Sequence, residues 1–132
     1  MNNYVVAFDT ANEMISLGIG LLDRAKKTID CIASREVGAF RASNVKLLPE
    51  IDALLADAGI SCGEVACVVC GRGPGSFTGV RIGISIIKGL AFGKGKICIG
   101  VSTLEAMARN FLTLCSGTLI CPVMDARRGQ LY

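Results

Sequence analysis

The segment from Gly71 to Gly83 is the strongest candidate for chemistry, because it joins a glycine-rich turn to the start of a predicted helix. Backbone amides at a helix N-terminus attract anions, so such a turn can hold a phosphate group. The spacing matches neither standard nucleotide motif. No glycine precedes Lys-Ser or Lys-Thr at P-loop spacing, and Gly-x-Gly-x-x-Gly counted from Gly71 or Gly73 ends on Ser76 or Thr78.

Two interpretations of this turn therefore stay open. One is a generic anion site, formed by the backbone of the turn and the helix that follows it. The other is purely structural: the glycines, among them Gly75, permit positive φ and close approach, Pro74 stiffens the turn, and Ser76 caps the helix.

Two cysteines at CxxC spacing, Cys67 and Cys70, are the next candidates, for redox or metal chemistry. They lie in a continuous apolar run that is typical of a buried strand, where a separation of three directs the two sulfurs to opposite faces. We therefore interpret them as core thiols. The chain has seven cysteines and no histidine, so it offers no imidazole for a zinc site or for a serine or cysteine nucleophile.

Aspartates close two further apolar runs. The run over residues 4–8 ends on Asp9 and Thr10, and the run over residues 119–124 ends on Asp125. Central strands that end this way deliver polar groups to the carboxyl edge of a sheet. We treat these three residues as a candidate nucleotide edge.

The elements that would position these residues follow from apolar periodicity. Runs over residues 4–8, 15–22 and 28–36 predict three consecutive strands in a meander. Strands at 65–70 and 96–100 then alternate with helices, which implies parallel neighbours and right-handed crossovers. The expected class is an α/β fold with a mixed five-stranded sheet in the order βββαβαβ, followed by a helix from Ser102 to about Leu114 and a strand at 119–124.

Two predicted helices lie within this order. The first starts near Asn44 with Pro49 in its first turn, stops at Gly59, and carries one apolar stripe; the residues of that stripe placed at a candidate interface are Leu47, Ile51, Leu54 and Leu55. The second, from about Phe77 to Phe92, is apolar on two faces. The face that includes Phe77, Val80, Ile84 and Ile87 is expected to cover the sheet, and the other is formed by Gly79, Ile82, Gly83, Ile86 and Leu90.

A second apolar face needs something to pack against it. Either the first helix of the same chain fills it or an intermolecular partner does, and a combined interface made by both helices accommodates the two possibilities. We expect such a contiguous apolar patch to be a protein contact site, with Gly79 and Gly83 allowing the neighbouring backbone to come close.

Composition limits the other function classes. The chain has 132 residues, a net charge of +3 and an apolar fraction of 52%. Arg81 and Lys88 interrupt its most apolar region, so no membrane span is expected. Without a signal-peptide pattern at the N-terminus we expect a cytoplasmic protein. Scattered basic residues and few aromatic residues predict no direct, specific nucleic-acid recognition.

Four motifs resemble the TsaB (YeaZ) family of tRNA threonylcarbamoyladenosine biosynthesis proteins. They are the start Val5-Val-Ala-Phe-Asp-Thr10, the block from Gly71 to Gly83, the segment Gly100-Val-Ser-Thr-Leu-Glu-Ala106, and Met124-Asp-Ala-Arg-Arg-Gly129. The similarity covers nearly the whole chain. The central block is the specific motif, and its residues are Gly71, Gly73, Pro74, Gly75, Ser76, Thr78, Gly79 and Arg81.

This resemblance implies an actin-like (ASKHA, ribonuclease H-like) lobe over residues 1–124, with residues 125–132 beginning a truncated second lobe. It implies a non-catalytic scaffold in the complex that modifies adenosine 37 of ANN-decoding tRNAs. The implied partners are the catalytic subunit TsaD and the ATPase TsaE, with a homodimer when the protein is alone. No cofactor and no metal are expected.

Departures from nucleotide-binding relatives bear on the alternative functions. The sequence Asp9-Thr-Ala-Asn12 lacks the glycine that actin-like ATPases place after the aspartate, and Arg127 and Arg128 stand in the second phosphate loop. Residues 42–48 lack the histidine metal motif of TsaD-type relatives. An actin-like ATPase or sugar-kinase-like activity is the alternative function, and a glycoprotease-like activity ranks last because no convincing nucleophile is present.

Overall fold

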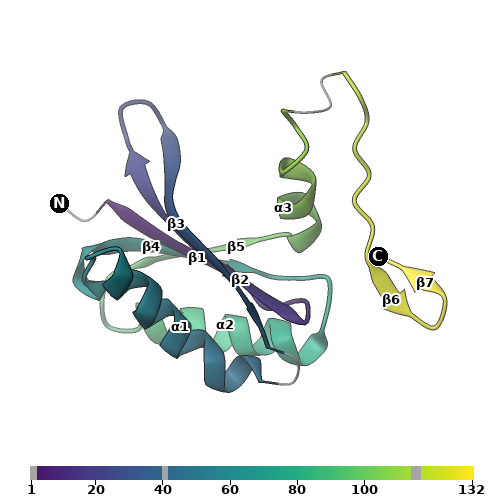
Figure 1. Ribbon diagram of the computed structural model, residues 1–132, viewed down its shortest axis with the longest axis horizontal. Coiled ribbons are helices and arrows are strands. Elements are labelled where there is room, and N and C mark those ends of the chain that lie inside the picture. Colours follow the sequence, from purple (N-terminus) through teal and green to yellow (C-terminus); the bar gives the residue numbers. More distant parts are fainter. Residues whose placement is uncertain (1–2, 40–41, 114–116) are drawn as a thin grey trace.

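The computed structural model describes residues 3–39, 42–113 and 117–132 (Figure 1). Its main body is a sheet with the strand order β3-β2-β1-β4-β5. The strands of this sheet are β1 (Tyr4–Asp9), β2 (Met14–Asp23), β3 (Thr28–Gly38), β4 (Val65–Gly71) and β5 (Ile97–Val101). The helices are α1 (Ser43–Asp57), α2 (Phe77–Ala91) and α3 (Thr103–Arg109), with a short 3-10 turn at Cys62–Glu64.

The pairing of the strands confirms the predicted mixed sheet. Strands β1, β2 and β3 form an antiparallel meander. Strand β4 pairs parallel to β1 and β5 pairs parallel to β4. Helix α2 lies on the crossover between the neighbours β4 and β5, and α1 lies on the connection from the edge strand β3 to β4. The carboxyl ends of β1, β4 and β5 therefore meet at one edge of the sheet.

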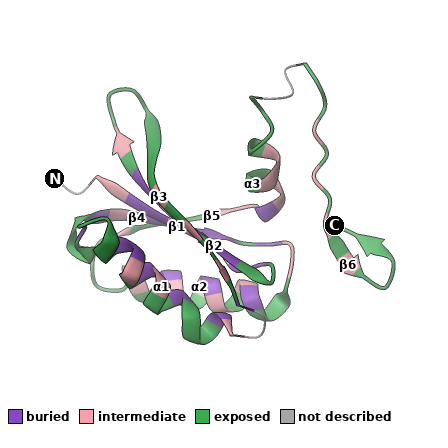
Figure 2. Cartoon of the chain, viewed as in Figure 1, coloured by how far each residue is buried: buried purple, intermediate pink, exposed green. Residues whose placement is uncertain are grey.

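Helices α1 and α2 lie side by side below the sheet in Figure 1, and the buried residues concentrate between them and the strands (Figure 2). Alternate residues of β2, namely Ile15, Leu17 and Ile19, point into this core, as the two-residue period of a strand requires. Each such aliphatic side chain gains about 1.5–3 kcal/mol from full burial. None of the helices within the described ranges is long and apolar enough to cross a bilayer.

Helix α1 is tied to the meander by one arginine. Arg35 on β3 donates to Glu50 at 3.0 Å and to Asp57 at 2.5 Å. This fork places one flank of α1 against β3, and the opposite flank faces α2. Hydrogen bonding to the two carboxylates raises the pKa of Arg35.

The ends of α1 partly differ from the expectation. Gly59 adopts a φ of 69° after the helix, as a helix stop requires. Pro49, however, lies inside α1 rather than in its first turn, because the helix begins at Ser43. Pro49 and Val45 are both on the exposed side, so the carbonyl that the proline leaves without an amide donor can be hydrated.

The C-terminal elements were predicted incorrectly. Residues 119–124 form no strand; instead Asp125–Arg127 (β6) and Gln130–Leu131 (β7) form a separate two-stranded sheet. Pro122 interrupts the apolar run and lacks an amide for pairing, and Leu119 is 92% exposed. Helix α3 ends at Arg109, and Leu114, where we expected its end, lies outside the described residues.

Candidate functional site

Asp9 lies at the carboxyl edge of the sheet, at the end of the middle strand β1. Its Oδ1 accepts the amide of Ala11 at 2.7 Å, and its Oδ2 accepts the hydroxyl of Thr103 at 2.6 Å. Thr103 is 3% exposed. Both carboxylate oxygens are thus bonded within the chain, and together they join the end of β1 to the start of α3.

Thr10 makes a second connection from this edge. It is fully buried, and its hydroxyl donates to the carbonyl of Gly79 at 2.7 Å. A side chain at Gly79 would collide with the carbonyl of Thr10. The first turn of α2 is therefore held against the end of β1, and only glycine fits at this contact.

The glycine-rich turn packs around the end of β1 and the residues that follow it. A side chain at Gly71 would overlap the Asp9 carboxylate, and one at Gly75 would come within 2.5 Å of the Ala11 carbonyl oxygen. Gly73 has a φ of 86°, which favours glycine. These glycines allow close approach of backbone to backbone, in agreement with the structural interpretation of the turn.

Several amides of the turn already have partners. The amide of Arg72 donates to the Val101 carbonyl and that of Ser76 donates to the Ala11 carbonyl at 2.7 Å, while the Gly73 carbonyl of the turn accepts from the amide of Thr103 at the start of α3. Ser76 caps α2 as predicted, its hydroxyl accepting the amide of Gly79 at 3.2 Å. These contacts favour a structural turn over an anion cradle, since the amides that they use cannot also bind a phosphate.

We define the group Asp9, Thr10, Gly79 and Thr103 as the edge clasp. Sequence reasoning placed Asp9 and Thr10 at this edge but missed Thr103. The available signal was its position after β5. Strand β5 is parallel to β4, and β4 is parallel to β1, so the hydroxyl of Thr103 reaches the same edge as Asp9.

Asp125, the third candidate for the nucleotide edge, and the motif residues Thr78 and Arg81 lie away from this edge. Asp125 is exposed in the two-stranded sheet, and its Oδ1 accepts the amide of Arg127 at 2.7 Å. It therefore belongs to a different sheet from Asp9. Thr78 and Arg81 point away from the core as exposed residues of α2, with the Arg81 guanidinium 5.2 Å from the centre of the Phe77 ring.

The two CxxC cysteines are both buried thiols. Cys67 is 7% exposed and Cys70 is fully buried. Burial, with a smaller contribution from the Asp9 charge, raises the pKa of Cys70 to about 11. Burial also raises the pKa of Cys67. Neither environment favours the thiolate that redox or metal chemistry needs.

The expected interface on α1 was wrong in its residues. Leu47, Ile51, Leu54 and Leu55 are at most 5% exposed and belong to the core of the chain itself. Because the apolar stripe of α1 packs on the sheet, it is not available to a partner.

The sheet contact of α2 runs between the two predicted faces, because Gly79 and Gly83 come from the predicted interface face and Ile87 from the face expected on the sheet. Gly79, Gly83 and Ile87 are the buried residues of the helix. A side chain at Gly83 would lie 2.7 Å from the Thr10 hydroxyl oxygen and 3.0 Å from the Cys70 sulfur. The glycines therefore bring α2 close to its own sheet, whereas Phe77, expected on the sheet, is 75% exposed.

Three residues of the predicted interface remain partly accessible: Ile82, Ile86 and Leu90. Leu90 lines a small apolar hollow together with Ile51 and Leu55 of α1. Ile86 and Ile82, one and two turns earlier, share this flank of α2. On α1 the flank opposite Arg35 carries Leu48, which is 42% exposed.

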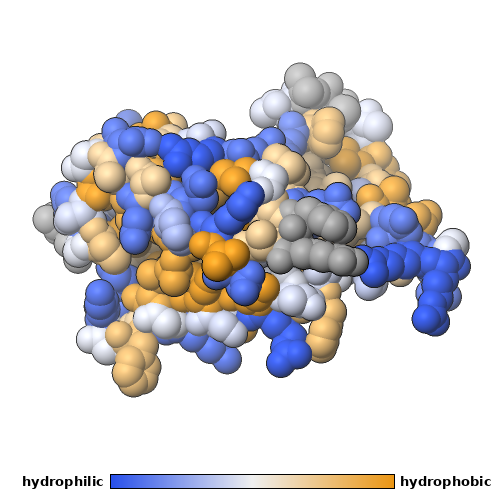
Figure 3. Space-filling model, turned by 60° about the horizontal axis from the view of Figure 1, so that its bottom comes forward, coloured by the Kyte–Doolittle hydropathy of each residue, from blue (hydrophilic) through white to orange (hydrophobic). Residues whose placement is uncertain are grey.

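We call the set Val45, Leu48, Ile82 and Ile86 the helix surface. Val45 is 67% exposed next to Leu48 on the outer side of α1. The space-filling view of this side shows hydrophobic side chains gathered over α1 and α2 with hydrophilic ones around them (Figure 3). Such a patch is typical of a protein contact site.

The sheet order, the crossovers and the edge clasp define an actin-like, ribonuclease H-like lobe. The family model described as TsaD, tRNA N6-adenosine threonylcarbamoyltransferase, matches residues 36–132. The tRNA threonylcarbamoyladenosine biosynthesis protein TsaB of Haemophilus influenzae is 39% identical over 132 residues, which are 99% of this chain and 52% of that protein. The chain belongs to the TsaB (YeaZ) family.

Two further comparisons agree with this assignment. TsaB of Bacillus subtilis is 35% identical over 129 residues, covering 97% of this chain and 52% of the relative. The structure of YeaZ from Pseudomonas aeruginosa superimposes with a TM-score of 0.82 at 30% identity, covering 98% of this chain and 57% of that one. The chain thus spans about half the length of these relatives.

Proposed function

We propose that this chain is a non-catalytic subunit in the formation of N6-threonylcarbamoyladenosine at position 37 of ANN-decoding tRNAs, and that it binds and activates a TsaD-like catalytic subunit. Membership of the TsaB family, whose members are named for this biosynthesis, carries the proposal. In this proposal residues 1–124 are the N-terminal lobe of a two-lobed protein and residues 125–132 begin the second lobe.

The edge clasp supports a scaffold over the alternative of an actin-like ATPase or sugar-kinase-like phosphotransferase. A nucleotide bound at this edge would need a free carboxylate at Asp9 to hold its metal ion or water. Both oxygens of Asp9 instead accept bonds of 2.6–2.7 Å from Thr103 and Ala11. Turning the Asp9 carboxylate toward a ligand would break the bond that joins β1 to α3 through Thr103, so this bond stabilises the lobe in its present form.

The helix surface is the docking site that we propose for the TsaD-like partner. It is apolar, and it lies on two helices packed against the same sheet, so it presents a firm surface. Apolar side chains within a polar surround form the central part of many protein interfaces. A second copy of the chain would occupy this surface when the partner is absent. A TsaE-like ATPase would join the assembled pair.

The proposal is tested in cells that lack the protein. Complementation by the full-length form should restore N6-threonylcarbamoyladenosine in total tRNA, measured by mass spectrometry, and the protein should co-purify with the TsaD-like subunit. Variant Asp125→Asn, which alters an exposed carboxylate outside the helix surface, is the matched control and should complement fully. Unchanged adenosine 37 modification in the deletion strain would refute the proposal.

A further inference from the structure

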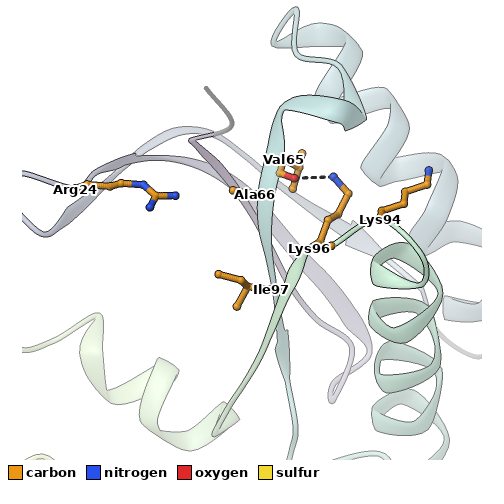
Figure 4. Close-up of a pocket in the computed structure, with 7 residues that line it drawn as sticks. Arg24, Val65, Ala66, Lys94, Lys96 and Ile97 are labelled. Atoms are coloured by element: carbon orange, nitrogen blue, oxygen red, sulfur yellow. Dashed lines mark hydrogen bonds between the residues drawn. The ribbon is translucent and has the colours of Figure 1, made fainter.

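A basic pocket lies at the opposite end of the sheet from the edge clasp. It has a volume of about 320 Å³ and lies beside the starts of β4 and β5. Arg24 reaches it from the β2–β3 turn, and Lys94 and Lys96 come from the turn that precedes β5 (Figure 4). Ala66 and Ile97 add an apolar wall. Two turns that are distant in sequence thus line one hollow, with Arg24 on one side of β4 and Lys94 and Lys96 on the other.

The positive charge of this pocket is uncompensated. None of its lining residues is acidic. In the part of the chain that the structure describes, Arg24, Lys94 and Lys96 take part in no salt bridge. Two neighbouring acids are already engaged: Asp23 bonds the amides of its own turn and Lys26, and Glu64 accepts from Ser61.

Lys96 is held in place without losing its charge. Its ammonium donates to the carbonyl oxygens of Cys62 and Val65, each at 2.6 Å. Carbonyl oxygens orient an ammonium group but do not neutralise it. Lys96 therefore supplies a fixed positive charge at the wall of the pocket, while Arg24 and Lys94 are exposed.

We propose that this basic pocket binds a phosphodiester group of RNA. A guanidinium on one side of the hollow and ammonium groups on the other provide cations for successive phosphates of one RNA strand. Lys27 adds a further cation on the same exposed β2–β3 turn as Arg24, which suits a chain of phosphates better than a single small anion. The exposed Ile97 offers apolar contact to the adjoining ribose or base.

This inference rests on the proposed function for the identity of the RNA as tRNA. It adds a contact that does not read the base sequence, because phosphate contacts position a nucleic acid without specifying it. It is therefore compatible with the absence of a sequence signal for specific recognition. The pocket would hold the tRNA body while the partner subunit acts on adenosine 37.

The test measures binding of an unmodified tRNA transcript to the full-length protein by fluorescence anisotropy at several KCl concentrations. The double variant R24A/K94A should bind at least about tenfold more weakly at about 100 mM KCl. The negative slope of log K against log salt should become shallower by about 1.5. The charge-preserving variant R24K/K94R should keep the slope. The matched control R81A/K88A removes one arginine and one lysine from α2 and should change neither value by as much.

Three outcomes would overturn the inference: no binding by the wild-type protein, equal loss in R24A/K94A and R81A/K88A, or unchanged tRNA affinity in R24A/K94A. Binding to the TsaD-like subunit is measured in parallel. If R24A/K94A loses tRNA but keeps the partner, the pocket inference holds. If the wild-type protein fails to bind the partner, the proposed function fails on its own evidence.

Discussion

Asp9 and Thr103 are 94 residues apart in the sequence, and their side chains share a hydrogen bond of 2.6 Å. This bond joins the first strand of the sheet to the start of α3. Because its acceptor is a carboxylate and Thr103 is buried, it is one of the stronger polar contacts available to the lobe.

Thr103→Val should therefore destabilise the protein. The substitution keeps the shape of the side chain but removes the hydroxyl donor, so Asp9 Oδ2 loses its partner. We expect a loss of about 1.5–3 kcal/mol in the free energy of unfolding, measured with urea. The control Thr78→Val alters an exposed threonine on α2 and should stay within about 0.5 kcal/mol. Equal effects of the two changes would show that the clasp contributes nothing.

Two glycines of α2 should respond to alanine with opposite sign. At Gly83 a methyl group would press on the Thr10 hydroxyl and the Cys70 sulfur, and we expect a cost of about 1–3 kcal/mol. At Gly89 nothing lies within 4 Å of the added atom, so alanine should stabilise the helix by about 0.5–1 kcal/mol. Thermal unfolding of both variants measures the difference. Stabilisation by Gly83→Ala would contradict the close contact between α2 and the sheet.

The burial of Cys67 and Cys70 predicts how thiol labelling and stability depend on pH. Burial raises the pKa of Cys70 to about 11, so at pH 8 only about one molecule in a thousand carries the reactive thiolate. Iodoacetamide at pH 8 should label the exposed Cys31 and Cys121 and leave Cys67 and Cys70 unlabelled, as peptide mass spectrometry can show. Because the folded pKa lies above the unfolded value, this contribution to stability is present below about pH 9 and is lost as the pH rises toward 11. Rapid labelling of Cys70 in the folded protein would exclude this burial.

Magnesium ATP should not stabilise the protein. A ligand that binds only the folded state raises the melting temperature by an amount that grows with the logarithm of its concentration relative to Kd, and the Asp9 carboxylate that would hold the metal already accepts a hydrogen bond on each oxygen. We expect a shift of less than about 1 °C with millimolar MgATP. A larger shift that grows with MgATP concentration and that Asp9→Asn abolishes would restore the ATPase alternative.

The sequence was sufficient for the mixed sheet and the crossovers, since strand and helix periods are local signals. It could not decide which face of α2 meets the sheet. Both faces are apolar, and the choice depends on Gly79 and Gly83 fitting against Thr10, a contact between distant segments. For the same reason the buried stripe of α1 resembled an interface. The C-terminal run 119–124 failed as a strand because strand formation needs a neighbour to pair with.

The site was predictable in part. Strand-end position alone placed Asp9 and Thr10 at the correct edge, and Ser76 at the N-cap followed from local capping chemistry. The role of Thr103 depends on the parallel pairing of β1, β4 and β5, which brings two distant strand ends together. The basic pocket escaped notice because Arg24 and Lys94 are seventy positions apart and isolated in sequence.

The affinity of the full-length protein for the TsaD-like subunit, measured by calorimetry, tests the central claim most directly. Leu48→Glu and Ile82→Glu place a charge in the helix surface, and each should weaken binding at least about tenfold. Leu119→Glu changes a side chain that is 92% exposed outside this surface and should bind as the wild type does. If Leu48→Glu and Ile82→Glu fold normally and bind the partner with wild-type affinity, the helix surface is not the docking site.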